Sequence, residues 1–415
     1  GKTAFHLGGG IFKDRGSILP PVYASGSAPV GYTSTAYYTT LDQLGAATGY
    51  RFPNGGFWTS GAWAFYGRMK TPTTTTYSMG IQQEIPLDIV LDVSYVGNIS
   101  RHTWINKDIN PIPVGSRFNP ANADPTTGGV LPDDFFRKYR GYTDVTAQLY
   151  EGTANYNALQ MKADRRFKNG LQIGAAYTWS KALGVVSGDG EAVSSYLNPG
   201  QYNYGPTAYD RTHSLVVNYW YDLPKLGKKL GSSGLGLITD DWSISGITSF
   251  VSGAPVTPVI SWQDGRDVTG STDASRGQLI GDPFSNVPAG MHFNPAAFAA
   301  TPKGTYGNVS FGNFGPGILR GPGVNNWDMT LSKRIPLGKN ERRYLQFKVE
   351  AFNAFNHTQF LSFVQGGAAT TGPSLTFNSS NTLIVVKDKN GNPVTGAYNA
   401  ARDPRKLQYS AKFYF

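Results

Sequence analysis

The 415-residue chain is poor in charged residues, at 15%, and rich in aromatic residues, at 13%. Soluble domains carry about a quarter charged residues, so an ordinary water-exposed surface is not expected. A bundle of membrane helices is excluded, because no apolar run reaches the roughly 18 residues that a crossing helix needs, and the mean hydropathy is −0.31. A transmembrane β-barrel reconciles these values, since its strands alternate lipid-facing apolar with lumen-facing polar residues.

Three further properties of the sequence limit the class of protein to which the chain can belong. The absence of cysteine excludes disulfides and thiolate metal sites. The net charge of +10 raises the question of nucleic acid, but Lys and Arg are scattered among expected turns and loops, so no nucleic-acid partner is expected. Residues 1–6 contain no apolar segment of a signal peptide. Because an exported protein must have carried one, either it was removed or the chain is a fragment, and we expect the second.

Period-two alternation of apolar and polar residues recurs along the whole chain and predicts strands. The clearest example is a hairpin that joins residues 156–167 to 171–183 through the tight-turn signal Lys168-Asn169-Gly170. Strands of about 8 to 13 residues suit tilted membrane crossings. The ten predicted strands cover residues 5–12, 74–86, 89–97, 156–167, 171–183, 213–224, 242–251, 326–335, 344–355 and 405–415.

The connections between these strands alternate strictly in length. Those that follow Ile85, Phe167, Leu223 and Ile335 are short or medium, and those between them are long. An antiparallel up-and-down barrel with tight periplasmic turns and large external loops gives this pattern. The long loops are rich in Gly, Pro, Asn, Thr and aromatic residues and read as ordered recognition surface. We expect ligand recognition in loops 98–154 and 254–325, without naming a contact residue.

The C-terminal strand carries the sharpest motif of the sequence. Its apolar residues alternate with polar ones, and the chain stops on a phenylalanine. Such a strand resembles the signal by which the outer-membrane barrel assembly machinery recognises its clients, whereas an ordinary edge strand ending this way would be an aggregation liability in water. The predicted assembly signal consists of Leu407, Tyr409, Ala411, Phe413 and Phe415.

Catalytic and cofactor motifs are weak throughout. The five histidines are dispersed without metal-ligand spacing. Residues 388–392 resemble a calcium loop but lack its distal Glu, and the Asn-Gly pair there serves a hairpin turn equally well. Gly-x-Ser-x-Gly is absent, and Gly1-Lys2-Thr3 lacks the strand and glycine of a phosphate-binding loop. We expect neither an enzyme nor a cofactor site.

With these residues in place, the chain resembles the TonB-dependent receptors, specifically the Oar-like branch with a carboxypeptidase-regulatory-like N-terminal domain. Individually the matching stretches are modest, but their order along the chain is fairly specific. They are Gly1 to Ala4 and Gly10 to Arg15, Thr71-Pro72 with Tyr77 to Glu84, Asp92 to Asn98, Asn155 to Gln160, Tyr177 to Leu183, Arg320 to Gly323, Asn326 to Asp328, and Glu350 to His357.

The resemblance implies ligand uptake at the bacterial outer membrane, driven through the TonB–ExbB–ExbD complex. It implies a barrel of about 22 strands with a plug, of which residues 1–415 would form one C-terminal barrel region that lacks the plug. The ligand stays open among carbohydrate, siderophore and peptide. Two other interpretations remain: a small self-contained porin or adhesin barrel, and a secreted all-β glycan-binding protein.

Overall fold

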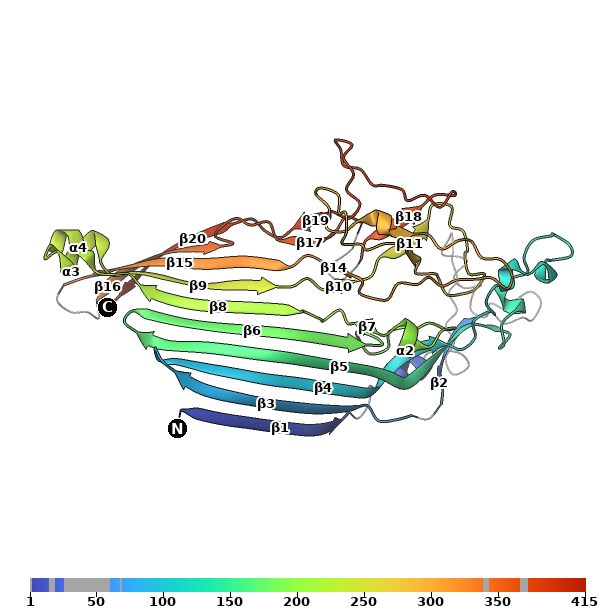
Figure 1. Cartoon of the computed structure of the whole chain (residues 1–415), viewed down its shortest axis with the longest axis horizontal. Coiled ribbons are helices and arrows are strands. Elements are labelled where there is room, and N and C mark those ends of the chain that lie inside the picture. Colours follow the sequence, from blue (N-terminus) through green and yellow to red (C-terminus); the bar gives the residue numbers. More distant parts are fainter. Residues whose placement is uncertain (1, 15–18, 26–59, 68, 339–342, 366–371) are drawn as a thin grey trace, which may run out of the picture.

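The computed structural model describes residues 2–14, 19–25, 60–67, 69–338, 343–365 and 372–415. Its main feature is one antiparallel sheet in which successive long strands are hydrogen-bonded neighbours (Figure 1). In order across the sheet these strands are β1 (Thr3–Lys13), β3 (Thr73–Ile85), β4 (Ile89–Asp108), β5 (Tyr142–Lys168), β6 (Leu171–Gly184), β8 (His213–Asp222), β9 (Trp242–Val251), β15 (Val324–Pro336), β16 (Tyr344–Phe352) and β20 (Lys406–Tyr414). They correspond to the ten predicted strands.

The sheet is not closed. In the described part of the chain, β1 and β20 are its two outer strands and each pairs on one side only. Two additional strands join the sheet at the margin: β2 (Ser60–Phe65) pairs in parallel with β5, and β7 (Gly205–Pro206) pairs with β6. No helix in the described ranges is both long enough and apolar enough to cross a membrane.

The turns divide by length between the two ends of the sheet (Figure 1). The short connections lie at the end where both termini are found, and the long loops gather at the other end. The tightest turn is the one predicted between β5 and β6: Lys168 pairs with Leu171, and Asn169 and Gly170 have φ values of 53° and 77°. Two consecutive positive φ values define the type I′ turn, which Asn-Gly favours because neither residue is strongly disfavoured there.

The medium connection between β8 and β9 forms two short helices at the same end as the tight turns. These are α3 (Leu226–Lys229) and α4 (Ser233–Thr239). Asp240 accepts hydrogen bonds from the backbone N–H groups of Gly227 and Lys228 at 2.8 and 2.9 Å. These bonds satisfy donors that a helix N-terminus leaves unpaired, and they hold the two helices together.

The pairing register keeps one face of the sheet apolar. Side chains at paired positions of antiparallel strands project to the same face. One such row crosses seven strands without a charged residue: Phe5, Ile81, Val93, Met161, Tyr177, Leu215 and Phe250. Leu7, next along β1 on this face, is 90% exposed, which is costly in water and favourable in hydrocarbon.

The opposite face is polar. The adjacent row brings together Gln82, Asp92 and Lys162, and on the far side of the sheet Thr330, Glu350 and Gln408 pair in register. Lys162 also contacts Asp164 on the same strand, with 2.6 Å between nitrogen and oxygen. Charged side chains in succession on one face suit a hydrated lumen.

Cross-strand glycines allow tyrosines of the apolar face to lie over the sheet. A Cβ atom at Gly97 would lie 2.5 Å from the Tyr77 ring. The absence of that Cβ lets Tyr77 cross the neighbouring strand and donate to Asn157 Oδ1 at 2.5 Å, an acceptor that Tyr95 also reaches at 2.9 Å. A Cβ atom at Gly246 would likewise lie 2.6 Å from the hydroxyl of Tyr219. These pairings fix the register of the strands concerned.

The long loops contain further elements. Two-stranded pairs form between β10 (Pro255–Val256) and β14 (Leu319–Arg320), β11 (Val259–Trp262) and β18 (Ser374–Phe377), β12 (Gln278–Leu279) and β13 (Phe298–Ala299), and β17 (Phe360–Phe363) and β19 (Tyr398–Ala401). The helical pieces are α1 (Leu19–Ser25), α2 (Pro199–Tyr202) and the 3-10 turns Ser116–Phe118, Pro120–Asn122, Asp133–Phe135 and Pro295–Ala297.

Candidate functional site

The long loops at one end of the sheet form a packed assembly with its own hydrophobic core. This main loop core joins residues 252–323 to residues 353–405, with Phe293 at 0% exposure near its centre. Phe293 contacts Phe298 and Phe363 edge to face, with ring centroids 5.9 and 5.4 Å apart. The buried members are Val256, Ile260, Phe293, Ala297, Phe298, Ala300, Phe314, Leu319, Phe363, Leu375 and Phe377. Loops with such a core have a defined surface, as a recognition platform requires.

A second, smaller core lies where β4 and β5 extend beyond the other strands. Ile105, Ala147 and Leu149 of these extensions pack against Val185 and Val193 of the loop that follows β6. The prediction placed all of residues 98–154 in a loop, and this was wrong at both ends of the segment: β4 continues to Asp108 and β5 begins at Tyr142. The true loop between them is residues 109–141.

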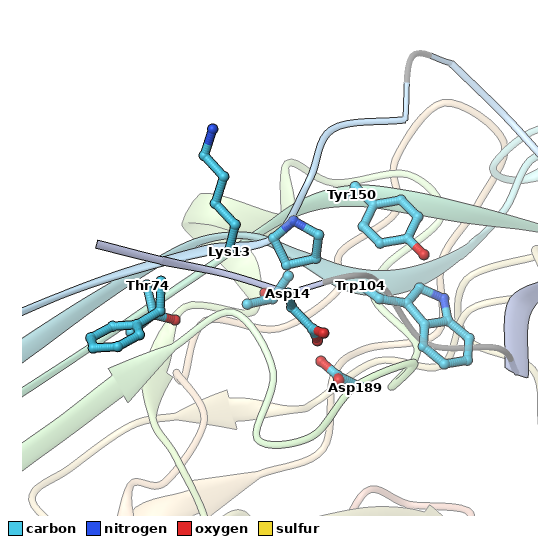
Figure 2. A pocket seen from close by; sticks show the side chains of 9 residues that line it. Lys13, Asp14, Thr74, Trp104, Tyr150 and Asp189 are labelled. Carbon is cyan, nitrogen blue, oxygen red and sulfur yellow. The ribbon is translucent and has the colours of Figure 1, made fainter. Parts of the chain in front are cut away.

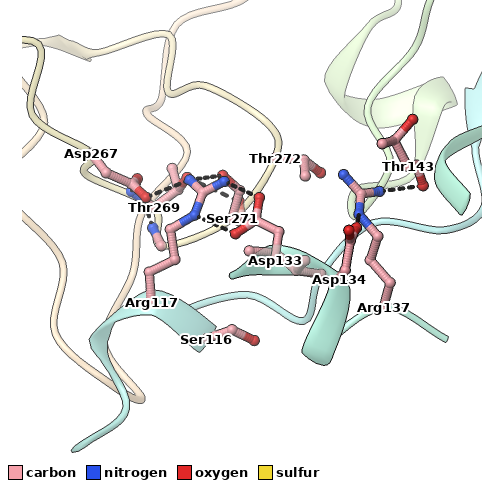
Figure 3. A network of polar contacts seen from close by, with 12 residues as sticks. Ser116, Arg117, Asp133, Asp134, Arg137, Thr143, Asp267, Thr269, Ser271 and Thr272 are labelled. Atoms are coloured by element: carbon pink, nitrogen blue, oxygen red, sulfur yellow. Dashed lines mark hydrogen bonds and ion pairs between the residues drawn. The ribbon is translucent and has the colours of Figure 1, made fainter. Parts of the chain in front are cut away.

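Arg117 links two of the loops by charge (Figure 3). Its guanidinium contacts Asp133 through two hydrogen bonds of 2.9 and 2.6 Å, and it contacts Asp267 of the loop that follows β9 at 2.7 Å. It also donates to the carbonyl of Ser271 at 2.9 Å. The hydrogen bond from Arg117 lowers the pKa of Asp133 and keeps that carboxylate charged. Planar guanidinium groups are suited to such paired acceptors.

Asp273 makes the corresponding link to the loop that follows β6. Its carboxylate accepts hydrogen bonds from Ser194 Oγ at 2.8 Å, from the Ser195 backbone N–H at 2.8 Å, and from Ser195 Oγ at 3.0 Å. Nearby, the Arg276 guanidinium lies 3.7 Å from the centre of the Tyr202 ring. Residues 109–141, 185–212 and 252–323 therefore form one connected unit.

The two predicted recognition segments, 98–154 and 254–325, are brought together in this unit. Sequence reasoning did not single out the segments 185–212 and 353–405, which supply the other halves of the two cores. The length of these two segments was the only indication that the sequence offered. Their length does not indicate which other loop each segment packs against.

One cavity of about 310 Å³ lies at the loop end of β1, β3, β4 and β5 (Figure 2). Two carboxylates line it, Asp14 from the end of β1 and Asp189 from the loop after β6, and in Figure 2 they point toward the same space. The walls include Trp104 and Tyr150, which are only 4% and 6% exposed. The other lining residues are Phe12, Lys13, Pro72, Thr74 and Thr103.

The predicted assembly signal lies on the apolar face of an edge strand. In β20, Tyr409 is 71% exposed and pairs with Val349, and Phe413 is 57% exposed and pairs with Leu345. Leu407 and Ala411 share this face by alternation, and Phe415 follows the strand at 92% exposure. The row is accessible along its whole length, and its role in assembly stays a prediction.

The resemblance of residues 388–392 to a calcium loop has a local explanation. Asp388 accepts hydrogen bonds from the backbone of Asn390 and Asn392 at 2.8 and 2.9 Å, and Gly391 has a φ of 85°. These bonds lower the pKa of Asp388. A turn in which an aspartate side chain accepts hydrogen bonds from the following backbone N–H groups is an Asx turn. Within the described ranges no three His, Cys, Asp or Glu residues are placed to hold a metal ion.

Comparison with known proteins gives a family match over nearly the whole chain. Residues 1–408 match the family model described as "Outer membrane beta barrel domain". No curated protein sequence matches.

Several solved outer-membrane proteins are similar at low identity. The ferric-catecholate import receptor Fiu from E. coli K12 has 11% identity and a TM-score of 0.38, with 100% of this chain and 33% of that chain covered. The outer membrane transporter YddB from Escherichia coli has 10% identity and a TM-score of 0.40, with coverage of 86% and 34%. The siderophore receptor PirA from Acinetobacter baumannii has 11% identity and a TM-score of 0.37, with coverage of 85% and 33%.

This chain spans about a third of the length of these solved proteins. The antiparallel sheet, its alternation of one apolar and one polar face, and the match over residues 1–408 agree. The chain belongs to the outer membrane β-barrel domain family, and its location is the bacterial outer membrane.

Proposed function

We propose that the chain is the C-terminal barrel portion of a TonB-dependent receptor, whose outer loops bind a ligand for energised uptake. The packed loop assembly is the observation that carries this proposal. Its cores and charged links hold residues 109–141, 185–212 and 252–323 in one arrangement. Loops that a rigid scaffold positions are the usual place of binding residues.

The resemblance in sequence to the Oar-like branch supplies the energised part of the proposal. In this view residues 1–415 form one barrel region, and the TonB complex acts through an N-terminal part outside this chain. Outer-membrane lipid surrounds the apolar face, and the barrel assembly machinery binds the C-terminal strand. Two of the similar solved proteins are named for siderophores or ferric catecholates, while carbohydrate and peptide ligands remain equally open. The proposal includes no catalytic step.

Uptake by whole cells tests the proposal. Three strains are compared: one that expresses the protein, one that lacks it, and one that expresses it with TonB inactivated. The probes are a radioiron-loaded catecholate siderophore, a labelled maltohexaose and a labelled oligopeptide mixture. We expect at least one probe to accumulate only when both the protein and TonB are present. Accumulation that depends on the protein but persists without TonB contradicts energised uptake and favours a passive pore.

The two alternatives predict other behaviour. A self-contained porin or adhesin barrel requires β1 to pair with β20, and in the described residues these strands are unpaired on their outer sides. A secreted glycan-binding protein would stay dissolved without detergent. Heat-modifiable migration on gels in detergent, together with extraction only by detergent, is the result expected for the barrel.

A further inference from the structure

We propose that the helix pair α3–α4 lies in the periplasmic leaflet of the outer membrane, where its apolar side chains enter the lipid and its lysines bind anionic phospholipid headgroups. The pair connects β8 to β9 and projects beyond the turn end of the sheet (Figure 1). That end faces the periplasm in an up-and-down barrel with long external loops. The inference goes beyond the proposed function, because it depends on neither a ligand nor TonB.

The exposed apolar side chains of the pair are the first argument. Leu230, at the C-terminal end of α3, is 69% exposed, and Ile238 of α4 is 70% exposed. Leu226, Leu235 and Leu237 are exposed as well. Apolar side chains gathered on a few turns of helix are unfavourable in water and favourable in hydrocarbon. An apolar environment is therefore expected on the outer side of the pair.

The two helices are held together without these side chains. Gly227 is buried against Gly236, and a Cβ atom at Gly227 would lie 2.2 Å from the backbone of Gly236. Asp240 completes the contact through its hydrogen bonds to the backbone of Gly227 and Lys228. Because glycines and a carboxylate join the helices, the leucines and the isoleucine are left for an external surface.

The pair is joined to the lipid-facing side of the sheet. Trp242 and Lys333 are paired on β9 and β15, and by strand alternation they lie on the apolar face with Phe250. The Nε1–H of Trp242 donates to the carbonyl of Ile238 at 2.7 Å, and Lys333 donates to the carbonyl of Asp240. Tryptophan is typical of the boundary between membrane and water. The C-terminal end of α4 therefore borders the surface that lipid covers, at the level of the headgroups.

Charge determines the kind of lipid that fits. Lys225, Lys228 and Lys229 lie beside the apolar side chains in the sequence. Lys225 forms an ion pair with Asp241 at 2.5 Å, whereas the side chains of Lys228 and Lys229 are exposed and make no hydrogen bond or ion pair with the described residues. Lysines next to an interfacial helix attract anionic headgroups, and their long stems can lie along lipid while the ammonium group stays hydrated. Phosphatidylglycerol therefore fits this surface better than a zwitterionic lipid.

Fluorescence quenching in vesicles tests the insertion. The chain has no cysteine, so Leu230→Cys and Ile238→Cys can each carry a single nitrobenzoxadiazole dye on the full-length protein in vesicles of phosphatidylethanolamine and phosphatidylglycerol. Gln172→Cys is the control, because Gln172 is exposed near the same end of the sheet but lies on the polar face. We expect a nitroxide on the lipid acyl chain to quench the dyes at 230 and 238, and iodide on both sides of the bilayer not to quench them. The dye at 172 should not be quenched by the lipid nitroxide.

A second comparison tests the headgroup. The nitroxide is carried by a trace of either phosphatidylglycerol or phosphatidylcholine in phosphatidylcholine vesicles, and the dye at 230 reports the lipid nearby. We expect the phosphatidylglycerol nitroxide to be enriched there about fivefold for each lysine, equivalent to about 1 kcal/mol. The double variant Lys228→Gln, Lys229→Gln should lose this preference. The control Lys348→Gln, Lys412→Gln removes two charges from the polar face of β16 and β20 and should keep it.

Three results overturn the proposal. Quenching of both helix dyes by iodide but not by the lipid nitroxide places the pair in water. Shielding of both dyes from both quenchers assigns the surface to a protein, a second copy of this chain or another partner. Equal quenching by the two nitroxide lipids, or equal loss of preference in the two double variants, refutes the role of the lysines. Heat-modifiable migration confirms that each variant is folded.

Discussion

Replacement of Arg117 by alanine should loosen the contact between residues 109–141 and the loop after β9 without unfolding the sheet. Arg117 makes two ion pairs, with Asp133 of its own loop and with Asp267 of the loop after β9. The side chains of all three residues are about 30% exposed, so the pairs are screened in part by solvent. At about 1 kcal/mol for each pair, the change should cost the loop assembly about 2 kcal/mol, or about a 30-fold shift toward the open form.

Hydrogen exchange followed by mass spectrometry measures this shift directly, since exchange of protected amides reports local opening. We expect exchange to accelerate about 30-fold in peptides that cover residues 109–141 and 262–275, with the strands β4 to β9 unchanged. Arg140→Ala is the matched control: it removes the same charge from the same loop, at an exposed residue that makes no hydrogen bond or ion pair with the described residues. Equal acceleration in both variants, or none in Arg117→Ala, refutes the reasoning.

The ion pair between Arg117 and Asp133 should make the loop assembly sensitive to acid. Because Arg117 lowers the pKa of Asp133 in the folded state, this pair contributes stability above the unfolded pKa of about 4. That contribution is lost as the pH falls through the lowered folded value. The protection factors at residues 109–141, which are exchange rates divided into the intrinsic rate of an unprotected amide at the same pH, should therefore be unchanged between pH 7 and pH 5 and should fall below about pH 4. A loss of protection that is already complete at pH 5 contradicts the assignment.

Three further substitutions test the loop core, the sheet and the C-terminal strand separately. Phe293→Ala should destabilise the main loop core by about 3 to 5 kcal/mol. Protease should then cleave within residues 252–323 while the heat-modifiable migration of the barrel persists, and resistance of this segment to cleavage contradicts the prediction. Gly97→Ala should displace the Tyr77 ring, which a Cβ would approach to 2.5 Å, and lower barrel stability in urea by about 1 to 3 kcal/mol; an unchanged midpoint is the contrary result. Phe413→Ser should reduce assembly into the outer membrane and raise periplasmic degradation, whereas Lys412→Ser on the other face should not; equal effects would remove the assembly role.

The strands of the sheet were readable from the sequence because a membrane imposes a strict period of two. Lipid on one side and water on the other make each alternate residue apolar, as in β6 and β15. The turn at Asn169-Gly170 was readable for a separate reason, since two adjacent positive φ values select that dipeptide. The strict alternation of short and long connections then fixed which end carries the loops.

The same signal fails where both faces of a strand are covered. In the extension of β4, the consecutive residues Trp104, Ile105 and Asn106 are all buried, so alternation disappears and the segment reads as a loop. Residues 147–150 of β5 are buried in succession as well. The boundaries of the predicted loop 98–154 were wrong for this reason.

The contacts between loops could not be predicted from the sequence. Arg117 and Asp267 are 150 positions apart, and nothing in either loop marks the other as its partner. The cavity has the same character: Asp14, Tyr150 and Asp189 come from three separate segments and meet only because β1, β5 and the loop after β6 end in the same region.

The orientation of the two faces of the sheet is the central claim, and spin labels on β5 test it most directly. The chain has no cysteine, so single cysteines at residues 159 to 163 can each be labelled and their collisions with oxygen and with a water-soluble nickel chelate compared in lipid bilayers. We predict that labels at 159, 161 and 163 collide mainly with oxygen, and those at 160 and 162 mainly with the nickel chelate. Absence of this alternation, or its reversal, contradicts the membrane orientation of the sheet.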